Sequence, residues 1–408
     1  MSENTKNSIN RRSFSLGTAA LALGAANVHA ADTPAPKKVK LGVIGCGGRG
    51  SWIAGLFAAH GGYEVVAGAD YFQDRLDAFG KKFSIVGDKL YAGLGGYKKL
   101  LESGGVDAVA IESPPYFHPE QAEAAVAAGK HAYVAKPVAV DVPGCKSIEA
   151  SGAAATKKGL VYLVDFQTRA DQYYMECLKR VHDGGLGTLC FGEATYHASD
   201  PFMRMTLELQ KDPKNPELKL RAWGVDQALS GDIITEQNIH TLDVASWIMN
   251  QDPVRAFGTG ARKIRKLGNC YDTFTITFEY PDQVGVAFSS KQFSGHGTQP
   301  AGIRNRMFGS EGVLETSYGG DCLVRGKSFY RGGKSPSIYK SGAVKNIADF
   351  HAAIQSGDCK NETVAPSVQS NLVTVLGRTA AYEGRIVEWQ EMLEANETLA
   401  ADLSGLKA

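Results

Sequence analysis

The sequence contains little cysteine, no long apolar run and almost no net charge. Its seven cysteines are scattered over 408 residues and never form a C-x-x-C pair, which argues against a structural zinc site and a disulfide framework. Every apolar run is shorter than the ~20 residues that a helix needs to cross a bilayer. The formal charge of +1 at pH 7 gives no basic excess for binding nucleic acid or an anionic membrane. We therefore expect a compact globular protein without a metal, nucleic-acid or membrane partner.

The N-terminal region has the pattern of an export signal. Residues 10–16 read N-R-R-S-F-S-L, a moderately apolar stretch follows, and small residues precede Ala31. This pattern predicts a signal peptide over residues 1–30 that is read by the twin-arginine export machinery, with a disordered basic tail as the alternative. We expect a periplasmic or other extracytoplasmic protein that is exported already folded.

The stretch from Val39 to Asp70 organises the first half of the chain. An apolar run ends in Gly45, Cys46, Gly47, Gly48, Arg49 and Gly50, and a helix-like segment and a second apolar run follow. G-x-G-x-x-G between a strand and a helix predicts a dinucleotide pyrophosphate site. Its glycines permit a tight turn, close approach of the backbone to phosphate, and packing of the helix on the strand. The N-terminus of that helix favours the negative charge of the phosphate. A glycine-rich turn without a ligand is the alternative.

Asp70 indicates which dinucleotide is bound. It ends the second apolar run, where its carboxylate can accept hydrogen bonds from the adenosine ribose and would repel a 2′-phosphate. NAD is therefore favoured over NADP, although Arg75 nearby would soften the repulsion. Because no free nicotinamide pool exists outside the cytoplasm, we expect an exported protein of this kind to retain its cofactor throughout the catalytic cycle.

Strand and helix patterns alternate from residue 36 to residue 168. This alternation predicts an α/β fold with a doubly wound parallel sheet, the Rossmann arrangement. Ligands of such sheets bind beyond the carboxyl ends of the strands, which here points to Ser113–His118, Ala135–Pro137 and Gln167–Arg169. Lys136 is the strongest catalytic candidate among them, because a residue before proline is biased towards an extended backbone that would direct its ammonium into the cleft.

Residues 169–408 form a second predicted domain, of the α+β class. Strand patterns cluster at residues 188–196, 254–261, 273–280 and 284–290, without intervening helices, which indicates an antiparallel sheet. Met203–Leu220 is polar, contains two prolines and is predicted to be a long insertion or lid. Trp223 closes this insertion and is expected to help build the substrate pocket.

Residues 231–247 have the spacing of one helix. That spacing would place Glu236, His240, Asp243 and Trp247 on one face. Histidine has an unperturbed pKa near neutrality and suits the transfer of a hydroxyl proton, so His240 is predicted as a general acid/base. A buried hydrogen bond between His240 and an aspartate is the structural alternative, and a metal site built from these acids and the histidine is another.

The chain resembles the Gfo/Idh/MocA family (glucose–fructose oxidoreductase, inositol dehydrogenase and rhizopine catabolism proteins). The resemblance is carried by the glycine loop, Ser113–His118, Gly129–His131, Lys136-Pro137, Glu236–His240 and Phe308–Gly312. It implies a Rossmann domain joined to a domain with a large, open, mostly antiparallel sheet, and commonly a homo-oligomer, either a dimer or a tetramer. It also implies NAD(P)-dependent oxidation or reduction of sugars and cyclitols. Family members usually have Glu before Lys-Pro, whereas this chain has Ala135, which puts the substrate specificity in doubt.

Taken together, these patterns assign each candidate residue to a role. Lys136, His240 and Glu236 are the predicted catalytic group, with Glu236 as a substrate or orienting contact. The predicted cofactor contacts are Gly45, Cys46, Gly47, Gly48, Arg49, Gly50, Asp70, Ser113, Pro114, His118 and Lys136. The predicted substrate contacts are Gln167, Arg169, Trp223 and Asn238. His118 could instead make a structural hydrogen bond, and Arg169 could instead pair with a carboxylate at the domain junction.

The sequence thus favours an exported NAD-dependent oxidoreductase that acts on a secondary hydroxyl of a sugar, glycoside or cyclitol. Exported relatives within the resembling family include glycosidases that use retained NAD for a transient oxidation at C3, followed by elimination and hydration. A protein that senses carbohydrate or dinucleotide without turnover is a third possibility, which the intact pair Lys136 and His240 argues against.

Overall fold

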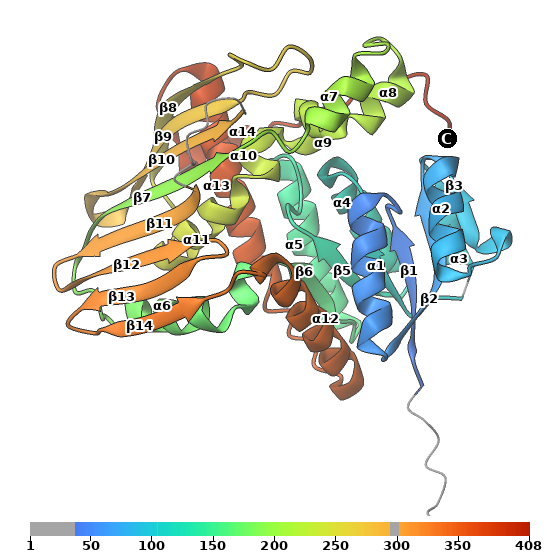
Figure 1. Ribbon diagram of the computed structural model, residues 1–408, viewed down its shortest axis with the longest axis horizontal. Helices are drawn as coiled ribbons and strands as arrows, with labels where there is room; N and C mark the ends of the chain where they lie inside the picture. Colours follow the sequence, from blue (N-terminus) through green and yellow to red (C-terminus); the bar gives the residue numbers. More distant parts are fainter. Residues whose placement is uncertain (1–36, 104, 294–301) are drawn as a thin grey trace, which may run out of the picture. The chain divides into compact units, whose positions relative to one another are not determined.

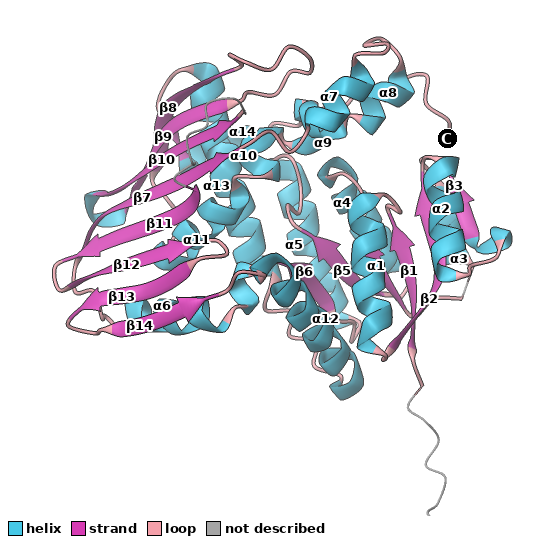
Figure 2. Cartoon of the chain, in the orientation of Figure 1, coloured by secondary structure: helices cyan, strands magenta, loops and turns pink. Residues whose placement is uncertain are grey.

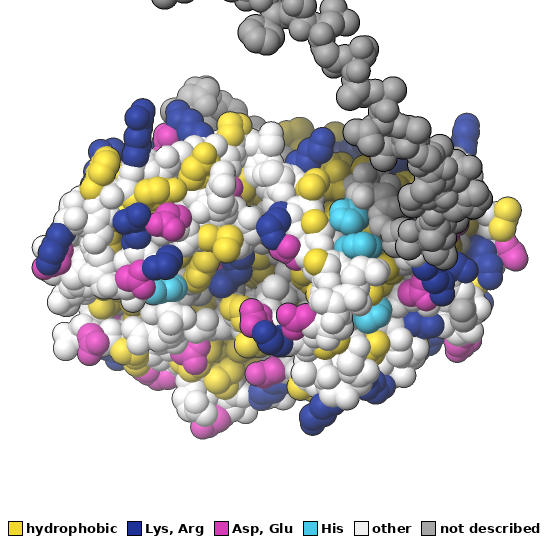
Figure 3. All heavy atoms as spheres, turned by 90° about the horizontal axis from the view of Figure 1, so that it is seen from below, with side chains coloured by type: hydrophobic (Ala, Val, Ile, Leu, Met, Phe, Trp, Pro, Cys, Tyr) yellow, Lys and Arg dark blue, Asp and Glu magenta, His cyan; other side chains and the backbone are white. Residues whose placement is uncertain are grey.

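A computed structural model describes residues 37–103, 105–293 and 302–408, and the predicted signal peptide lies outside these residues. Residues 38–408 form one unit that is built on two β-sheets (Figure 1). Within the described residues, no helix combines the length and apolar character needed to span a membrane. On the face that Figure 3 shows, basic and acidic side chains are interspersed, in agreement with the small net charge.

The first sheet has six strands in the order β3-β2-β1-β4-β5-β6, and all of its pairs are parallel. Its strands are β1 Val39–Ile44, β2 Tyr63–Asp70, β3 Leu90–Ala92, β4 Ala108–Ile111, β5 His131–Ala135 and β6 Tyr162–Asp165. The central strands are buried on both faces, as the short β-branched runs predict. The doubly wound parallel sheet expected from the sequence is therefore confirmed.

Five helices connect these strands. They are α1 Gly48–His60, α2 Gln73–Phe83, α3 Gly96–Glu102, α4 His118–Ala127 and α5 Val142–Lys157. Local sequence sets their ends: Asp141 caps α5 by accepting the N–H of Gly144 at 2.8 Å, Pro143 occupies its first turn, and Gly61 closes α1 in the left-handed conformation.

The second sheet has nine strands in the order β14-β13-β12-β11-β7-β10-β9-β8-β15. These strands are β7 Leu189–Ala198, β8 Arg255–Ala261, β9 Thr273–Tyr280, β10 Val284–Gln292, β11 Gly302–Gly309, β12 Gly312–Ser317, β13 Asp321–Gly326, β14 Tyr330–Lys334 and β15 Val387–Glu388. All pairs are antiparallel except β7 with β10. The sheet is large, open and mostly antiparallel, as the family resemblance implies.

Helices cover one face of this sheet and connect it to the first (Figure 2). The helices of this half are α6 Gln172–His182, α7 Met203–Leu209, α8 Pro216–Arg221, α9 Gln227–Ser230, α10 Asp232–Glu236, α11 Ile239–Met249, α12 Ile338–Ser356, α13 Val364–Glu383 and α14 Trp389–Ala395. Helix α13 packs on β8 and β9 and also on α5, while α12 packs on α1. The late helices therefore join the two halves, and one continuous core runs between them.

The predicted lid forms α7 and α8 and crosses the Rossmann half. Arg221 makes two hydrogen bonds to Asp74 at 2.6 and 3.1 Å, and Tyr71 donates to Glu217 at 3.0 Å. The C-terminal tail follows the same surface, where the Lys407 N–H donates to the Tyr71 hydroxyl at 3.1 Å. Both segments are therefore fastened to the region that follows β2.

Candidate active site

The predicted glycine loop forms the turn between β1 and α1. Gly45 has a φ of +91°, a conformation that favours glycine. A Cβ on Gly50 would lie 1.7 Å from the Gly45 carbonyl oxygen, so only glycine lets α1 begin so close to the strand. The Cys46 N–H donates to Asp70 Oδ2 at 2.8 Å, which fixes the loop to the end of β2. The first N–H groups of α1 lack intrahelical acceptors and are a ready position for phosphate.

A cavity of about 280 Å³ opens beside this loop. Its wall includes most of the predicted cofactor residues, namely Gly45, Gly47, Gly48, Arg49, Gly50, Asp70, Ser113 and Pro114. Cys46 is buried behind the wall, where its thiol fills space as a small apolar group. The glycine loop, the strand-end carboxylate and the cavity together fit the pyrophosphate and adenosine of a dinucleotide.

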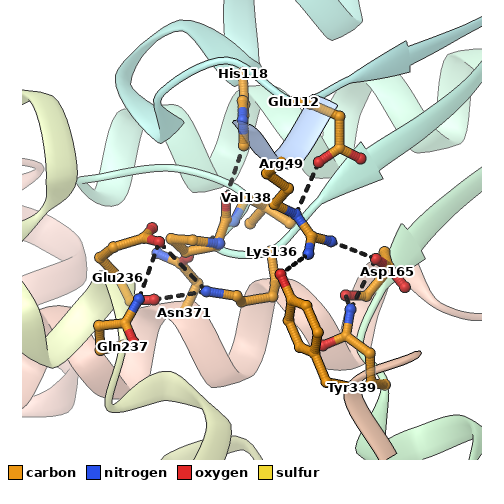
Figure 4. A network of polar contacts seen from close by, with 12 residues as sticks. Arg49, Glu112, His118, Lys136, Val138, Asp165, Glu236, Gln237, Tyr339 and Asn371 are labelled. Atoms are coloured by element: carbon orange, nitrogen blue, oxygen red, sulfur yellow. Dashed lines mark hydrogen bonds and ion pairs between the residues drawn. The ribbon is translucent and has the colours of Figure 1, made fainter. Parts of the chain in front are cut away.

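Two predicted contacts lie elsewhere than expected. Trp223, which the sequence assigns to the substrate pocket, lines the dinucleotide cavity, because the lid folds across the Rossmann half. His118, which the sequence assigns to the cofactor, is buried with its ring nitrogens 2.8 Å from the Pro137 oxygen and 2.7 Å from the Ser113 oxygen (Figure 4). It therefore makes the structural hydrogen bond that was the alternative, and it joins the two loops that follow β4 and β5.

Lys136 is buried directly after β5 and points towards Glu236, at the end of α10 in the second half (Figure 4). Its Nζ donates to the Glu236 backbone oxygen at 2.6 Å and lies 3.5 Å from Glu236 Oε1. Burial lowers the pKa of Lys136, and the Glu236 carboxylate opposes this shift. Burial likewise raises the pKa of Glu236, which the charge of Lys136 opposes. Two of the three predicted catalytic residues, Lys136 and Glu236, are therefore brought together across the two halves.

The predicted single helix over residues 231–247 is wrong. Helix α10 ends at Glu236 and α11 begins at Ile239, so Gln237 and Asn238 form a break between them. His240 lies in the first turn of α11 and is buried, and its ring is tilted against the ring of Tyr318 with the ring centroids 5.2 Å apart. Burial, and then the charges of Lys136 and Arg49, lower the pKa of His240 well below its ordinary value. The imidazole is therefore neutral at pH 7, as a proton acceptor must be.

Asp243 forms an ion pair with Arg169 and is not the partner of His240. Arg169 Nε donates to Asp243 Oδ1 at 2.9 Å, and the guanidinium also lies over the Trp247 ring. This is the ion pair at the domain junction that was the alternative for Arg169. Within the described part of the chain, no three His, Cys, Asp or Glu side chains are grouped so as to hold a metal ion.

Asn238 and Gln167 present unused polar atoms close to this centre. Oδ1 and Nδ2 of Asn238 are buried without a hydrogen-bond partner among the described residues, and so is Nδ1 of His240. Gln167 donates to Asp165 Oδ2 at 2.7 Å, while its Oε1 is buried and unpartnered there. Buried polar atoms rarely stay unpaired, so these groups are suited to bind a hydroxyl-rich ligand.

Sequence reasoning missed two acids that bind Arg49. Arg49 forms ion pairs with Glu112 Oε2 at 2.8 Å and with Asp165 Oδ2 at 2.6 Å, and it also donates to the Tyr339 hydroxyl. Its side chain therefore turns towards these carboxylates. Glu112 directly follows β4 and Asp165 ends β6, so the rule for strand ends would have found both if its ranges had begun one or two residues earlier.

Two family models match the chain. The model described as "Oxidoreductase family, NAD-binding Rossmann fold" matches residues 39–166, and the model described as "GFO/IDH/MocA C-terminal domain" matches residues 174–315. The first match identifies the Rossmann half as an NAD-binding domain. Together the two models span the glycine loop, Lys136 and His240.

Individual relatives are similar at lower identity. An inositol 2-dehydrogenase of Pseudomonas savastanoi pv. phaseolicola is 31% identical over 56% of this chain and 60% of its own length. A glycosyl hydrolase family 109 protein of Phocaeicola vulgatus is 30% identical over 41% of this chain and 31% of its own length. The chain thus spans less than two thirds of these curated relatives. The crystal structure of a scyllo-inositol dehydrogenase from Lactobacillus casei, with NAD(H) and scyllo-inositol, shares the fold, with a TM-score of 0.68 at 19% identity over 87% of this chain and all of that one.

Replacing Gly50 by Ala tests the glycine loop. The added Cβ would overlap the Gly45 backbone, so we expect the free energy of unfolding to fall by about 3 kcal/mol and NAD binding to be lost. Gly55→Ala is the matched control on the same helix, because its Cβ would meet only Lys82 Nζ at 3.9 Å. This control should stabilise the protein by about 0.5–1 kcal/mol. Denaturant unfolding of both variants makes the comparison, and equal stabilities would contradict it.

Replacing Glu112 by Gln tests how the buried carboxyl group affects the pH dependence of the free energy of unfolding. Burial raises the pKa of Glu112 to about 7, with Arg49 opposing the shift. A carboxyl whose pKa is raised by folding contributes stability below about pH 4.5 that is lost as the pH rises through about 7. We therefore expect the wild-type free energy of unfolding to fall between these pH values relative to Glu112→Gln, by at most about 3 kcal/mol. Parallel pH profiles for the two proteins would refute this.

Proposed function

Because the chain belongs to the Gfo/Idh/MocA oxidoreductase family, we propose that it is an NAD-dependent oxidoreductase acting on a secondary hydroxyl of a sugar, glycoside or cyclitol. The observation that carries the proposal is the meeting of Lys136 with Glu236 beside a neutral, buried His240 at the carboxyl edge of an NAD-binding sheet. The inositol dehydrogenases among its relatives support a polyhydroxylated substrate.

Bound NAD would supply a two-electron acceptor and donor, and the residues present fit it. The glycine loop would hold the pyrophosphate, and Asp70, whose oxygens accept the N–H groups of Cys46 and Phe72, would face the adenosine ribose. The Asp70 carboxylate disfavours a 2′-phosphate, although Arg75 lies 3.9 Å away. This arrangement supports NAD over NADP.

The residues of this chain divide the proton chemistry between them. Lys136 would donate a hydrogen bond to the reacting oxygen and stabilise negative charge that develops there. His240 would take the hydroxyl proton in oxidation and return it in reduction, since its lowered pKa keeps it neutral. Glu236 holds the Lys136 ammonium through its backbone oxygen. Asn238 would bind a neighbouring hydroxyl with its unpartnered amide.

We further propose that the cofactor is retained and that the protein is exported. Retention is supported by the lid, whose residues Leu220 and Trp223 line the dinucleotide cavity, and by the C-terminal tail, whose residues Leu403 and Leu406 pack against the lid in the same apolar cluster. Export is supported by the twin-arginine pattern in residues 10–16, which the described residues do not include.

A homo-oligomer is also proposed. Strands of the large sheet expose Phe191 and Phe257, each nearly half accessible, and Phe191 stacks on Phe308 with ring centroids 4.5 Å apart. Exposed apolar groups on an open sheet are suited to bind another copy of the chain.

A glycosidase is the second candidate, favoured by similarity to glycosyl hydrolase family 109 proteins. It would oxidise the substrate hydroxyl at C3 to a ketone, remove the acidified proton at C2 as the aglycone leaves C1, add water across the resulting double bond and reduce the ketone back to the hydroxyl. The same lysine and histidine could serve both reactions.

One experiment tests the function and separates the candidates. We expect one sample of the purified protein to release NAD(H) when it is denatured. We expect a second, native sample to act on members of a panel of sugars, cyclitols and aryl glycosides. Absorbance change of the bound cofactor without cleavage supports the oxidoreductase, and aglycone release without net redox change supports the glycosidase. Lys136→Met and His240→Gln should each lower turnover by about 10²–10⁴-fold. A protein that contains NAD but acts on none of the panel would contradict the proposal.

Deleting residues 401–408 tests retention. Because this removes contacts that support Leu94, Leu220 and Trp223 in the cavity wall, we expect NADH to dissociate about tenfold faster, as measured by the decay of its fluorescence after dilution. Asp74→Asn is a milder variant: its ion pair with Arg221 is partly exposed, so a contribution of about 0.5–1 kcal/mol and an acceleration of about two- to fivefold are expected. An unchanged rate in the deletion variant would rule out a role of the tail.

A further inference from the structure

The proposed mechanism leaves a buried charge cluster unused. Arg49 in the first turn of α1 binds Glu112 through Nε and Asp165 through Nη2, and both carboxylates are fully buried. Its Nη1 donates to Tyr339, whose ring also lies under the guanidinium, 5.3 Å from its centre. All three nitrogens of the guanidinium are therefore engaged (Figure 4).

The two acids flank Ala135 in the sheet. β5 pairs with β6 so that Ala135 lies opposite Asp165, and β4 pairs with β5 so that Ile111 lies opposite Val134. Glu112 therefore follows in register with Ala135. Paired residues of parallel strands direct their side chains to the same face of a sheet, so Asp165 shares a face with Ala135, and because Arg49 binds both acids, Glu112 lies on that face as well. Arg49 bridges them across this small residue, one position before Lys136.

The cluster also joins the cofactor loop to the second half of the protein. Asp165 accepts a hydrogen bond from Asn346 of α12 at 2.8 Å, and Tyr339 begins the same helix. Arg49 itself lines the dinucleotide cavity. The Arg49 side chain thus links the glycine loop to α12, the helix that packs on α1.

The charge of Arg49 reaches the catalytic residues. It acts with burial to lower the pKa of Lys136 and of His240. Among the described residues, the charged and titratable groups that act on His240 or contact its ring are Lys136 after β5, Arg49 of α1 and Tyr318 after β12. A buried ion-pair cluster is weak evidence for a role in stability, because desolvation offsets much of its attraction. Its position argues for a role in the site.

We propose that Arg49 is a positioning residue of the active site: held across Ala135 by Glu112 and Asp165, its guanidinium fixes the charge around Lys136 and His240 and fastens the glycine loop to α12. This proposal rests on the proposed function for its effect on turnover. Its effect on His240 is measurable without any substrate.

The variants Arg49→Gln and Arg49→Lys test whether the positive charge of Arg49 acts on the active site. In Arg49→Gln we expect NAD to remain bound, kcat to fall about tenfold or more, and the acid limb of the pH–rate profile to move to higher pH. Removing a positive charge stabilises the imidazolium, so the His240 resonance should also titrate at higher pH in NMR of isotope-labelled protein, with His240→Gln identifying the signal. Arg49→Lys keeps the charge and should leave this titration close to wild type. Arg378→Met removes another buried arginine, which donates to Val140 and Gly231, and controls for general destabilisation.

A relocated carboxylate provides a second test that does not require Arg49 variants to fold. Glu112→Ala removes one partner of Arg49, and adding Ala135→Glu returns a carboxylate one strand away. We expect the double variant to regain at least half of the thermal stability and turnover that the single variant loses. The proposal is overturned if His240 titrates in Arg49→Gln as in wild type, or if Ala135→Glu does not rescue Glu112→Ala. If NMR shows the expected shift while no carbohydrate is turned over, the proposed function fails and the placement of the charge by Arg49 stands.

Discussion

The structure depends on charges that are buried at the carboxyl edge of a parallel sheet. Removing an ion from water costs several kcal/mol unless it is paired and hydrogen-bonded. Lys136 meets this requirement through the backbone and carboxylate of Glu236, and Arg49 meets it through Glu112 and Asp165. The Arg49 cluster is built within the Rossmann half, whereas Glu236 belongs to α10 of the second half, so Lys136 gains its partner only when both halves of the chain are folded together.

The cost of burying a charge also determines the protonation state of His240. His240 has positive neighbours, and its buried ring lies against the ring of Tyr318. A neutral imidazole therefore costs less than a charged one. The result is a base beside an ammonium, which is the combination that alcohol oxidation requires. The dinucleotide cavity is likewise shared, because lid residues from the second half complete a wall that the Rossmann strands begin.

Sequence patterns predicted the parts of this site that depend on local geometry. The glycine loop could be placed because the steric demand at Gly45 and Gly50 is met within a few residues. Asp70 and Lys136 could be placed because strand ends in a parallel sheet share one edge. The same reasoning failed for His118, where backbone oxygens of two loops happen to face the ring, and for Trp223, whose neighbours follow from how the lid folds back.

The sequence by itself determined the Rossmann half, the mostly antiparallel second sheet and the family, because alternation, β-branched runs and glycine spacing act over short distances. Tertiary structure alone decided the break between Glu236 and Ile239, the pairing of Asp243 with Arg169, and the turn of Arg49 towards Glu112 and Asp165. Periodicity cannot report a helix break that contacts impose. Nor can it choose among carboxylates, since the register of strands and the packing of helices far apart in the sequence decide which acid meets which base.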